Sequence, residues 1–247
     1  MQFSTSGSTL LALVLLLPVT LLQDATADPD VSTLTAAQVL ERMTKTYAGC
    51  KSYRDTTDVH LELDDSAVNL SHFNIGQDKH AEIAFVRPDR FRFESTDALC
   101  HCIVWRQGAN IRSWSSLDAK VEFKHSLKDP LDAFAGVSGG TAKMIPGLLL
   151  PDEVGSPLSH LVDAERRRDA AVEGTPCFQI FGKLESSLPG KVKTFLITLW
   201  IDQHTFLVRR LVLKASPEKA TFTMTIDGKI DIDVSDNDLA FNPDKPK

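Results

Sequence analysis

Five residues near the middle of the chain have the pattern of a catalytic serine. Gly136-Val137-Ser138-Gly139-Gly140 matches the G-x-S-x-G nucleophile elbow, in which the serine follows a strand and precedes a helix. His160 and His204 lie downstream with aspartates between them, so a serine–histidine–aspartate triad is one interpretation. The residues before Ser138 have a helical pattern, however, and two glycines after it suit a flexible loop. We therefore predict a glycine hinge here and keep a serine hydrolase using Ser138 as an alternative.

The cysteines give no metal or haem signature. Cys100-His101-Cys102 puts two sulfurs on one face of a strand and the imidazole on the other, so one metal cannot take all three, and no second ligand pair at zinc spacing follows. Together with Cys50 and Cys177 the count is even, which permits two disulfides with three connectivities or simply buried thiols. We predict no metal and no cofactor.

The remaining polar features indicate no chemistry. Asp231 and Asp233 alternate on the polar face of an expected strand, where a solvated face explains them. Asn69-Leu70-Ser71 is a glycosylation sequon, which matters only in a eukaryotic secretory pathway. The formal net charge is −6, with no concentrated basic face, which argues against a nucleic-acid partner. We predict that the protein is not an enzyme.

The first residues have the composition of a signal peptide. Leu10 to Leu22 form an apolar run that is shorter than the ~20 residues needed to span a bilayer, and Ala25-Thr26-Ala27 follows with small residues at the cleavage positions. We expect a signal peptide over residues 1–27, cleavage after Ala27 and a single domain over residues 28–247. An uncut membrane anchor is the alternative.

The rest of the chain predicts a helix, about six strands, a helical insert and about five more strands. A capping box at Thr35 and Gln38 begins a helix over residues 35–49. The insert covers about residues 127–170: Leu131 starts a helical pattern, and Ser156-Pro157 resembles the start of a second helix continuing through Val162. Between them, the apolar Met144–Pro151 stretch is interrupted by prolines, which predicts an irregular segment.

The last part of the chain alternates strictly between apolar and polar residues from Thr194 to Val234. This period of two predicts four antiparallel strands with one dry face, joined by turns at residues 203–204, 216–218 and 227–228. Strands grouped on both sides of a helical insert indicate the α+β class. A sheet with one apolar face must be covered, so the nature of the cover becomes the functional question.

The order of several motifs resembles a known family. A capped N-terminal helix is followed by Arg87-Pro88-Asp89-Arg90-Phe91, a helical insert, a strand ending Leu199-Trp200-Ile201-Asp202 and a closing Phe241-Asn242-Pro243. This order is similar to the periplasmic outer-membrane lipoprotein carriers, and more closely to a bacterial family of unassigned function with that fold. The resemblance implies a curved, unclosed antiparallel β half-barrel with a helical lid insert, an N-terminal helix and a cavity for acyl chains.

Candidate site residues follow from the dry phase of the strands and from this resemblance. Arg87 is in phase with Ala81 and Ile83, and the carriers' Arg-Pro arginine bonds lid carbonyls, so Arg87 is the predicted gate; a side chain turned to solvent is the alternative. The predicted ligand cavity is lined by apolar side chains of the sheet and the insert: Phe85, Phe93, Phe195, Ile197, Leu199, Phe222, Met224, Ile226, Leu148 and Leu149.

The resemblance implies a periplasmic carrier that holds a lipid or a lipoprotein acyl chain under a movable lid. A membrane-associated protein that loads or receives the ligand is the implied partner. An envelope sensor or regulatory module of the same fold is the first alternative to a carrier.

Overall fold

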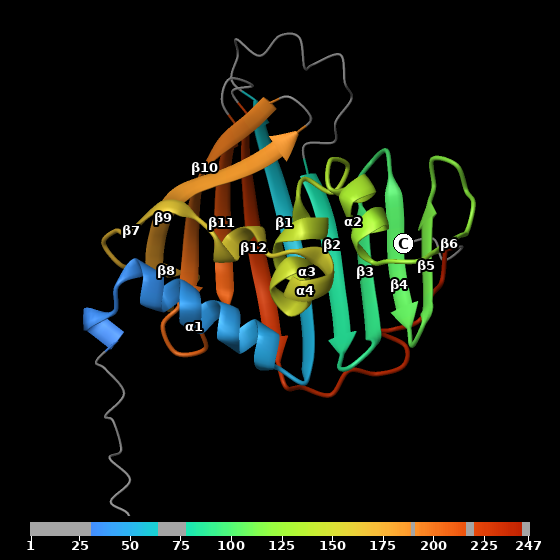
Figure 1. The fold of residues 1–247 in the computed structure, drawn as a ribbon, viewed down its shortest axis with the longest axis horizontal. Helices are drawn as coiled ribbons and strands as arrows, with labels where there is room; N and C mark the ends of the chain where they lie inside the picture. The colour runs from blue at the N-terminus through green and yellow to red at the C-terminus, as the bar shows by residue number, and fades with distance from the viewer. Residues whose placement is uncertain (1–30, 64–77, 189–190, 216–219, 244–247) are drawn as a thin grey trace, which may run out of the picture.

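Strands from both halves of the chain join in one curved antiparallel sheet (Figure 1). The structure is a computed structural model that describes residues 31–63, 78–188, 191–215 and 220–243. Within these residues the sheet has 12 strands in the order β6-β5-β4-β3-β2-β1-β12-β11-β10-β9-β7, and β8 pairs with β9. The sheet is unclosed, so the predicted α+β half-barrel is confirmed.

The strands of the first half are β1 (Ser52–Leu63), β2 (Asp78–Val86), β3 (Arg90–Thr96), β4 (His101–Gln107), β5 (Asn110–Ser115) and β6 (Glu122–Lys124). Those of the second half are β7 (Val162–Arg166), β8 (Ala170–Val172), β9 (Thr175–Leu188), β10 (Lys191–Asp202), β11 (Val208–Ala215) and β12 (Ala220–Ile230). The helices are η1 (Val31–Thr33), α1 (Ala36–Gly49), α2 (Lys128–Phe134), α3 (Thr141–Leu149), α4 (Pro151–Val154) and η2 (Pro157–Ser159).

The two halves meet along β1 and β12, which pair in register over the full length of β12. Val59 lies opposite Met224, and Leu61 lies opposite Phe222. Residues along β1 alternate between buried and exposed from Tyr53 to Glu62, as expected for a strand with one dry face. The pairing makes β1 a central strand, although its partners β2 and β12 are far apart in the sequence.

Helices α1, α2, α3 and α4 lie on one side of the sheet, on the face that we call the inner face (Figure 1). The predicted capping box is present at the start of α1: Gln38 N donates to Thr35 Oγ1, and Thr35 N donates to Gln38 Oε1 at 2.9 Å. From α1, Val39, Leu40, Met43 and Tyr47 are buried, the spacing of an amphipathic helix. We call residues 128–159, which contain α2, α3, α4 and η2, the helical segment.

The opposite, outer face is partly covered by the chain that follows β12. Val234 and Leu239 pack with Ala84 of β2. Trp105 Nε1 donates to Leu239 O at 2.7 Å, and the Trp105 ring lies 5.9 Å from the Phe241 ring. The Phe241-Asn242-Pro243 motif therefore helps to fasten the C-terminal segment across β4.

Most of the Met144–Pro151 stretch is helical, which corrects the prediction of an irregular segment: α3 runs to Leu149, Leu150 interrupts the helix, and α4 begins at Pro151. Pro146 lies inside α3 and removes one backbone hydrogen bond, a loss of ~3 kcal/mol or more. Burial of Met144, Leu148 and Leu149 outweighs it, since each fully buried side chain of this size contributes ~1.5–3 kcal/mol. A Cβ at Gly147 would lie 2.3 Å from Gly155 O, so glycine is needed where the chain crosses α3.

The predicted second helix after Ser156 is also wrong. Its first residues form only the short turn η2, and Val162 begins β7, which pairs with β9. A helix of one or two turns is marginal in water, whereas the edge of β9 offers backbone partners. The helical segment thus ends near Ser159 rather than Ala170, and six strands rather than about five follow it within the described residues.

The predicted turn at Asp227-Gly228 is a continuous part of β12. Gly228 lies opposite Asp55 of β1, and a Cβ on it would be 2.6 Å from the hydroxyl oxygen of Tyr53. Glycine is therefore required here because the buried Tyr53 ring leaves no space for a side chain, and not because the chain turns. β12 ends at Ile230, so Asp231 and Asp233 do not lie on a strand; Asp231 Oδ1 accepts a hydrogen bond from Lys51 N at 2.7 Å.

Three predicted features lie outside the described residues: the signal peptide with its cleavage site after Ala27, the Asn69-Leu70-Ser71 sequon and the turn at residues 216–218. In the part of the chain that is described, no helix is both long enough and apolar enough to cross a bilayer.

Candidate ligand-binding site

The predicted cavity residues come together on the inner face and beneath the helical segment. Eight of them are at most 3% exposed and belong to the main hydrophobic cluster: Phe85, Phe93, Ile197, Leu199, Met224, Ile226, Leu148 and Leu149. Phe195 and Phe222 are partly buried against the same cluster. These two also pack against a small cluster at the end of the sheet where β1 ends and β12 begins, formed by Leu61, Ala215 and Ala220.

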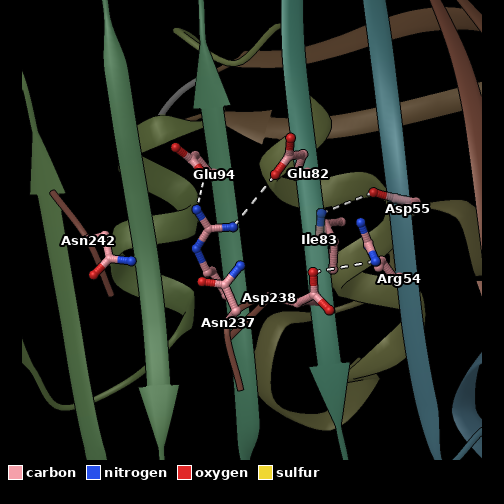
Figure 2. A pocket seen from close by; sticks show the side chains of 10 residues that line it. Arg54, Asp55, Glu82, Ile83, Glu94, Asn237, Asp238 and Asn242 are labelled. Atoms are coloured by element: carbon pink, nitrogen blue, oxygen red, sulfur yellow. Dashed lines mark hydrogen bonds and ion pairs between the residues drawn. The ribbon is translucent and has the colours of Figure 1, made fainter. Parts of the chain in front are cut away.

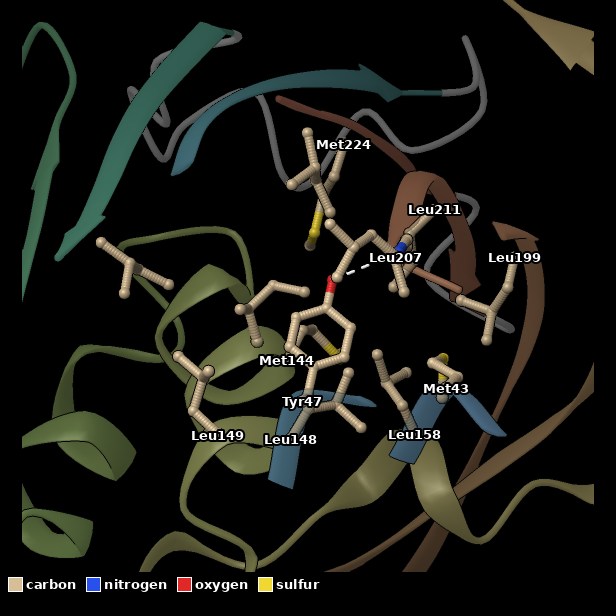
Figure 3. Packing of buried hydrophobic residues seen from close by; sticks show 14 of the residues in the cluster. Met43, Tyr47, Met144, Leu148, Leu149, Leu158, Leu199, Leu207, Leu211 and Met224 are labelled. Atoms are coloured by element: carbon tan, nitrogen blue, oxygen red, sulfur yellow. Dashed lines mark hydrogen bonds between the residues drawn. The ribbon is translucent and has the colours of Figure 1, made fainter. Parts of the chain in front are cut away.

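Side chains from α1 and the helical segment fill the inner face (Figure 3). Met144 and Leu148 of α3 lie close to Tyr47 of α1, and Met224 of β12 lies on the sheet side of the same cluster. Leu158, immediately after η2 begins, is fully buried. In this conformation the space beside the inner face is occupied by the protein's own apolar side chains, so a ligand must displace some of them.

A short polar network is buried inside this apolar region. Tyr53 Oη donates to Asp55 Oδ2 at 2.7 Å, and Ile83 N donates to Asp55 Oδ1 at 3.1 Å. Burial raises the pKa of Asp55 to about 7, against the opposing effect of these two hydrogen bonds. Tyr47 Oη accepts from Val208 N at 3.1 Å, which ties α1 to β11.

Arg87 joins the ends of two helices to the sheet. Its Nε donates to Cys50 O at 2.7 Å, and its Nη2 donates to Tyr47 O at 3.2 Å, both at the end of α1. The same Nη2 donates to Leu149 O at 3.0 Å, at the end of α3. The last carbonyls of a helix lack intrahelical partners and carry the negative end of its dipole, so a guanidinium is well suited to bind them. The side chain therefore points inward, over the ring of Phe85.

The glycine loop between α2 and α3 rests directly on the inner face. Gly139 and Gly140 have φ angles of 64° and 96°, which favour glycine. A Cβ on Gly139 would lie 3.2 Å from Val59 Cγ1, and one on Gly140 would lie 3.3 Å from Met224 Cε. The loop thus needs glycine both for its backbone conformation and for its close approach to the sheet.

Ser138 does not have the surroundings of a nucleophile. It follows α2 rather than a strand, its residue is fully buried, and its Oγ accepts a hydrogen bond from Ala142 N at 3.2 Å in the first turn of α3. Its own hydroxyl donates to Ala135 O at 3.4 Å. These contacts are those of a helix cap, and the strand–turn–helix geometry of a nucleophile elbow is not present around it.

All four cysteines are buried free thiols, so none of the three disulfide connectivities is formed. The hydrogen bond from Cys102 is the main cause that lowers the pKa of Cys100 to about 6. His101 points to the other side of β4, where its Nε2 lies 2.6 Å from Glu94 Oε1. Among the described residues, no group of three or more histidine, cysteine or acidic side chains is placed to hold a metal ion.

A polar pocket of about 220 Å³ lies on the outer face, beside the C-terminal segment (Figure 2). Its charged groups pair with one another: Arg54 Nη1 lies 3.4 Å from Asp238 Oδ1, and Arg92 bonds Glu94 and lies 3.7 Å from Glu82. The pair of Arg54 and Asp238 therefore ties the C-terminal segment to β1 at this pocket.

Comparison with known proteins agrees with the architecture. No protein-family model matches the chain, and no curated protein matches its sequence significantly. LprF from Mycobacterium bovis is similar in structure, with a TM-score of 0.51 and 13% identity over 84% of this chain and 96% of LprF. At this identity the likeness shows the fold alone. The chain therefore shares its fold, a curved unclosed β half-barrel covered by helices, with LprF.

Two further solved structures are similar with lower scores. The lipoprotein LppX of Mycobacterium tuberculosis has a TM-score of 0.48 and 14% identity, over 81% of this chain and 97% of LppX. The MucA/MucB complex of Pseudomonas aeruginosa has a TM-score of 0.47 and 14% identity, over 84% of this chain and 61% of the matched chain.

Several residues of the inner face were not predicted from the sequence. Met43 and Tyr47 of α1 have helical spacing, but only the fold shows that α1 packs on the same face as α3. A buried ion pair between Lys79 and Asp97 was also missed. The alternation along β2 did indicate a buried lysine, since Lys79 is in phase with Ala81 and Ile83, which point to the buried face.

Proposed function

We propose that the protein is a periplasmic carrier that holds an apolar ligand, a lipid or a lipoprotein acyl chain, between the inner face and the helical segment. The single observation that supports this most strongly is the arrangement around Arg87. An apolar cover lies over a curved apolar sheet, and the hydrogen bond to Leu149 O fastens the end of α3. In this proposal the helical segment is the lid, Arg87 is the gate, and the glycine loop is the hinge.

The apolar burial lost when the lid opens is close to the burial that a ligand would regain. Removing Met144, Leu148 and Leu149 from the inner face would forfeit roughly 5–9 kcal/mol of apolar burial, at ~1.5–3 kcal/mol each. An acyl chain that buries ten methylenes in their place would regain roughly 8 kcal/mol. The two amounts nearly cancel, so a small difference between closed and open contacts decides whether ligand is bound.

A lipophilic dye tests the proposal. We expect 1-anilinonaphthalene-8-sulfonate to bind the native protein stoichiometrically and to be displaced by a long-chain fatty acid. Met224→Lys places a charge in the dry phase of β12 and should abolish binding, because Met224 is 1% exposed beside the glycine loop. Leu196→Lys is the matched control: it adds the same charge on β10 at a side chain that is 39% exposed, and binding should persist.

The result that overturns the carrier proposal is a folded native protein that binds no dye and no fatty acid. The inner face would then be an ordinary core. Capture of a transmembrane partner by a protein that carries no stoichiometric lipid would instead favour a sensor of the same fold. Labelling of Ser138 by a fluorophosphonate probe would favour a hydrolase.

A further inference from the structure

A buried ion pair lies under the glycine loop, on the inner face of the sheet. The side chains of Lys79 and Asp97 are 3% and 6% exposed, and Lys79 Nζ donates to Asp97 Oδ2. A Cβ on Gly139 would lie 3.4 Å from Lys79 Cδ and 3.6 Å from Phe222 Cδ1. The aliphatic part of the Lys79 side chain is therefore covered by the same loop that covers two predicted cavity residues, Phe222 and Met224.

The ammonium group has hydrogen-bonding capacity that its surroundings leave unused. Lysine has three donors, and in the described part of the chain Asp97 is the acceptor that Nζ binds. Two backbone amides share the other oxygen of Asp97: Oδ1 accepts from Leu99 N at 2.8 Å and from Cys100 N at 2.7 Å. Burial would raise the pKa of Asp97, but the hydrogen bonds from Lys79 and these amides hold it below its ordinary value. Among the described residues, two donors of this buried cation thus have no acceptor, which is costly.

A stripe of small polar side chains runs across the inner face next to this pair. Strand register places Ser95 of β3 opposite both Ala81 and Cys102, and Cys102 opposite Ser115 of β5. Ser95, Cys102 and Ser115 are each at most 7% exposed. This row of small polar side chains lies at the end of β3–β5 nearest Lys79, whereas Phe93 and Val104 keep the rest of the inner face apolar there.

We infer that Lys79 binds the anionic head group of an acyl ligand whose chain lies along the inner face of β12 and β10. This rests on the proposed carrier function and specifies its ligand class: a single acyl chain that ends in a carboxylate or a phosphate. When the helical segment opens at the glycine loop and uncovers Lys79, the Nζ donors that do not bind Asp97 become available to that group, while one stays on Asp97.

Ligands matched in chain length test the inference by displacement of the dye. Palmitate, 1-palmitoyl lysophosphatidate and hexadecanol share a sixteen-carbon chain, and only the first two carry an anionic head. Inorganic phosphate is the control without a chain. We expect the wild type to bind both anionic lipids about tenfold or more tightly than the alcohol, as for one added charge-assisted hydrogen bond. Inorganic phosphate should not displace the dye.

The variant Lys79→Met with Asp97→Asn removes both charges, which avoids leaving one of them buried alone. It should bind palmitate and hexadecanol equally, with the affinity for the alcohol unchanged. Lys183→Met is the control, since Lys183 pairs with Asp163 at an exposed site, and it should keep the wild-type preference.

Equal affinity of the wild type for palmitate and hexadecanol would overturn the inference while leaving the cavity in place. An unchanged preference in the double variant would overturn it too. If the double variant fails to fold, the wild-type comparison alone decides. A wild type that binds neither lipid refutes the carrier function itself, so the two failures are distinct.

Discussion

Replacing Arg87 by leucine tests whether one side chain fastens the lid. Of its three hydrogen bonds to carbonyls, two go to α1, at Tyr47 O and Cys50 O, and only the bond to Leu149 O reaches α3. A hydrogen bond from a charged group contributes ~1.5–3 kcal/mol. Removing it should therefore raise the open fraction of the lid roughly 10- to 150-fold, because 1.4 kcal/mol corresponds to a factor of ten.

Hydrogen exchange measures this directly. Amides of α3 should exchange faster in Arg87→Leu by roughly that factor, as long as exchange proceeds through opening of the lid. Arg90→Leu is the control: Arg90 begins β3, pairs with the exposed Asp236 and does not bind the lid. The leucine at position 87 also adds apolar surface to the inner face, so lipid that copurifies should rise in occupancy. Unchanged exchange across α3 would show that Arg87 is not a gate.

Three further predictions address the hinge, the buried carboxyl group and the N-terminus. Gly139→Ala should raise dye binding, because an alanine at this positive φ costs ~1–2 kcal/mol and its Cβ would press on Val59. Gly174→Ala is the control: it adds similar backbone strain, but its Cβ meets no other atom, so dye binding should not change. The pKa of Asp55 is about 7 in the folded state and ~3.9 in the unfolded state, so the folded state binds the proton more tightly. The free energy of unfolding should therefore fall as pH rises from about 4 to 7. Urea titrations of Asp55→Asn should lack this pH-dependent part of the free energy of unfolding. N-terminal sequencing should find Asp28 first, and an intact Met1 in a membrane fraction would contradict that.

The elements that depend on local sequence were predicted well. The capping box of α1 involves residues three apart, and alternation along β10 predicts which side chains point inward without knowledge of its neighbours. The inward direction of Arg87 followed in the same way from its phase with Ala81 and Ile83. A carbonyl partner on the lid, observed at Leu149 O, was expected from the resemblance to the carriers, whereas the two partners at the end of α1 were not expected.

The errors arose where distant parts of the chain decide the structure. Pro146 predicts a broken segment, but burial against the sheet keeps α3 helical. Gly228 has the signal of a turn, and only the Tyr53 ring across the β1–β12 pair explains a glycine inside a strand. The partner of Lys79 lies after β3, 18 residues away, so the ion pair could not be found from the pattern of β2 alone.

Native mass spectrometry of protein purified from its own cell envelope tests the central claim most directly. The carrier account predicts a population heavier than the bare chain by the mass of one acyl lipid. This lipid should be lost in Met224→Lys and retained in Leu196→Lys. A bare mass in every preparation, together with no uptake of added fatty acid by the folded protein, would contradict the account.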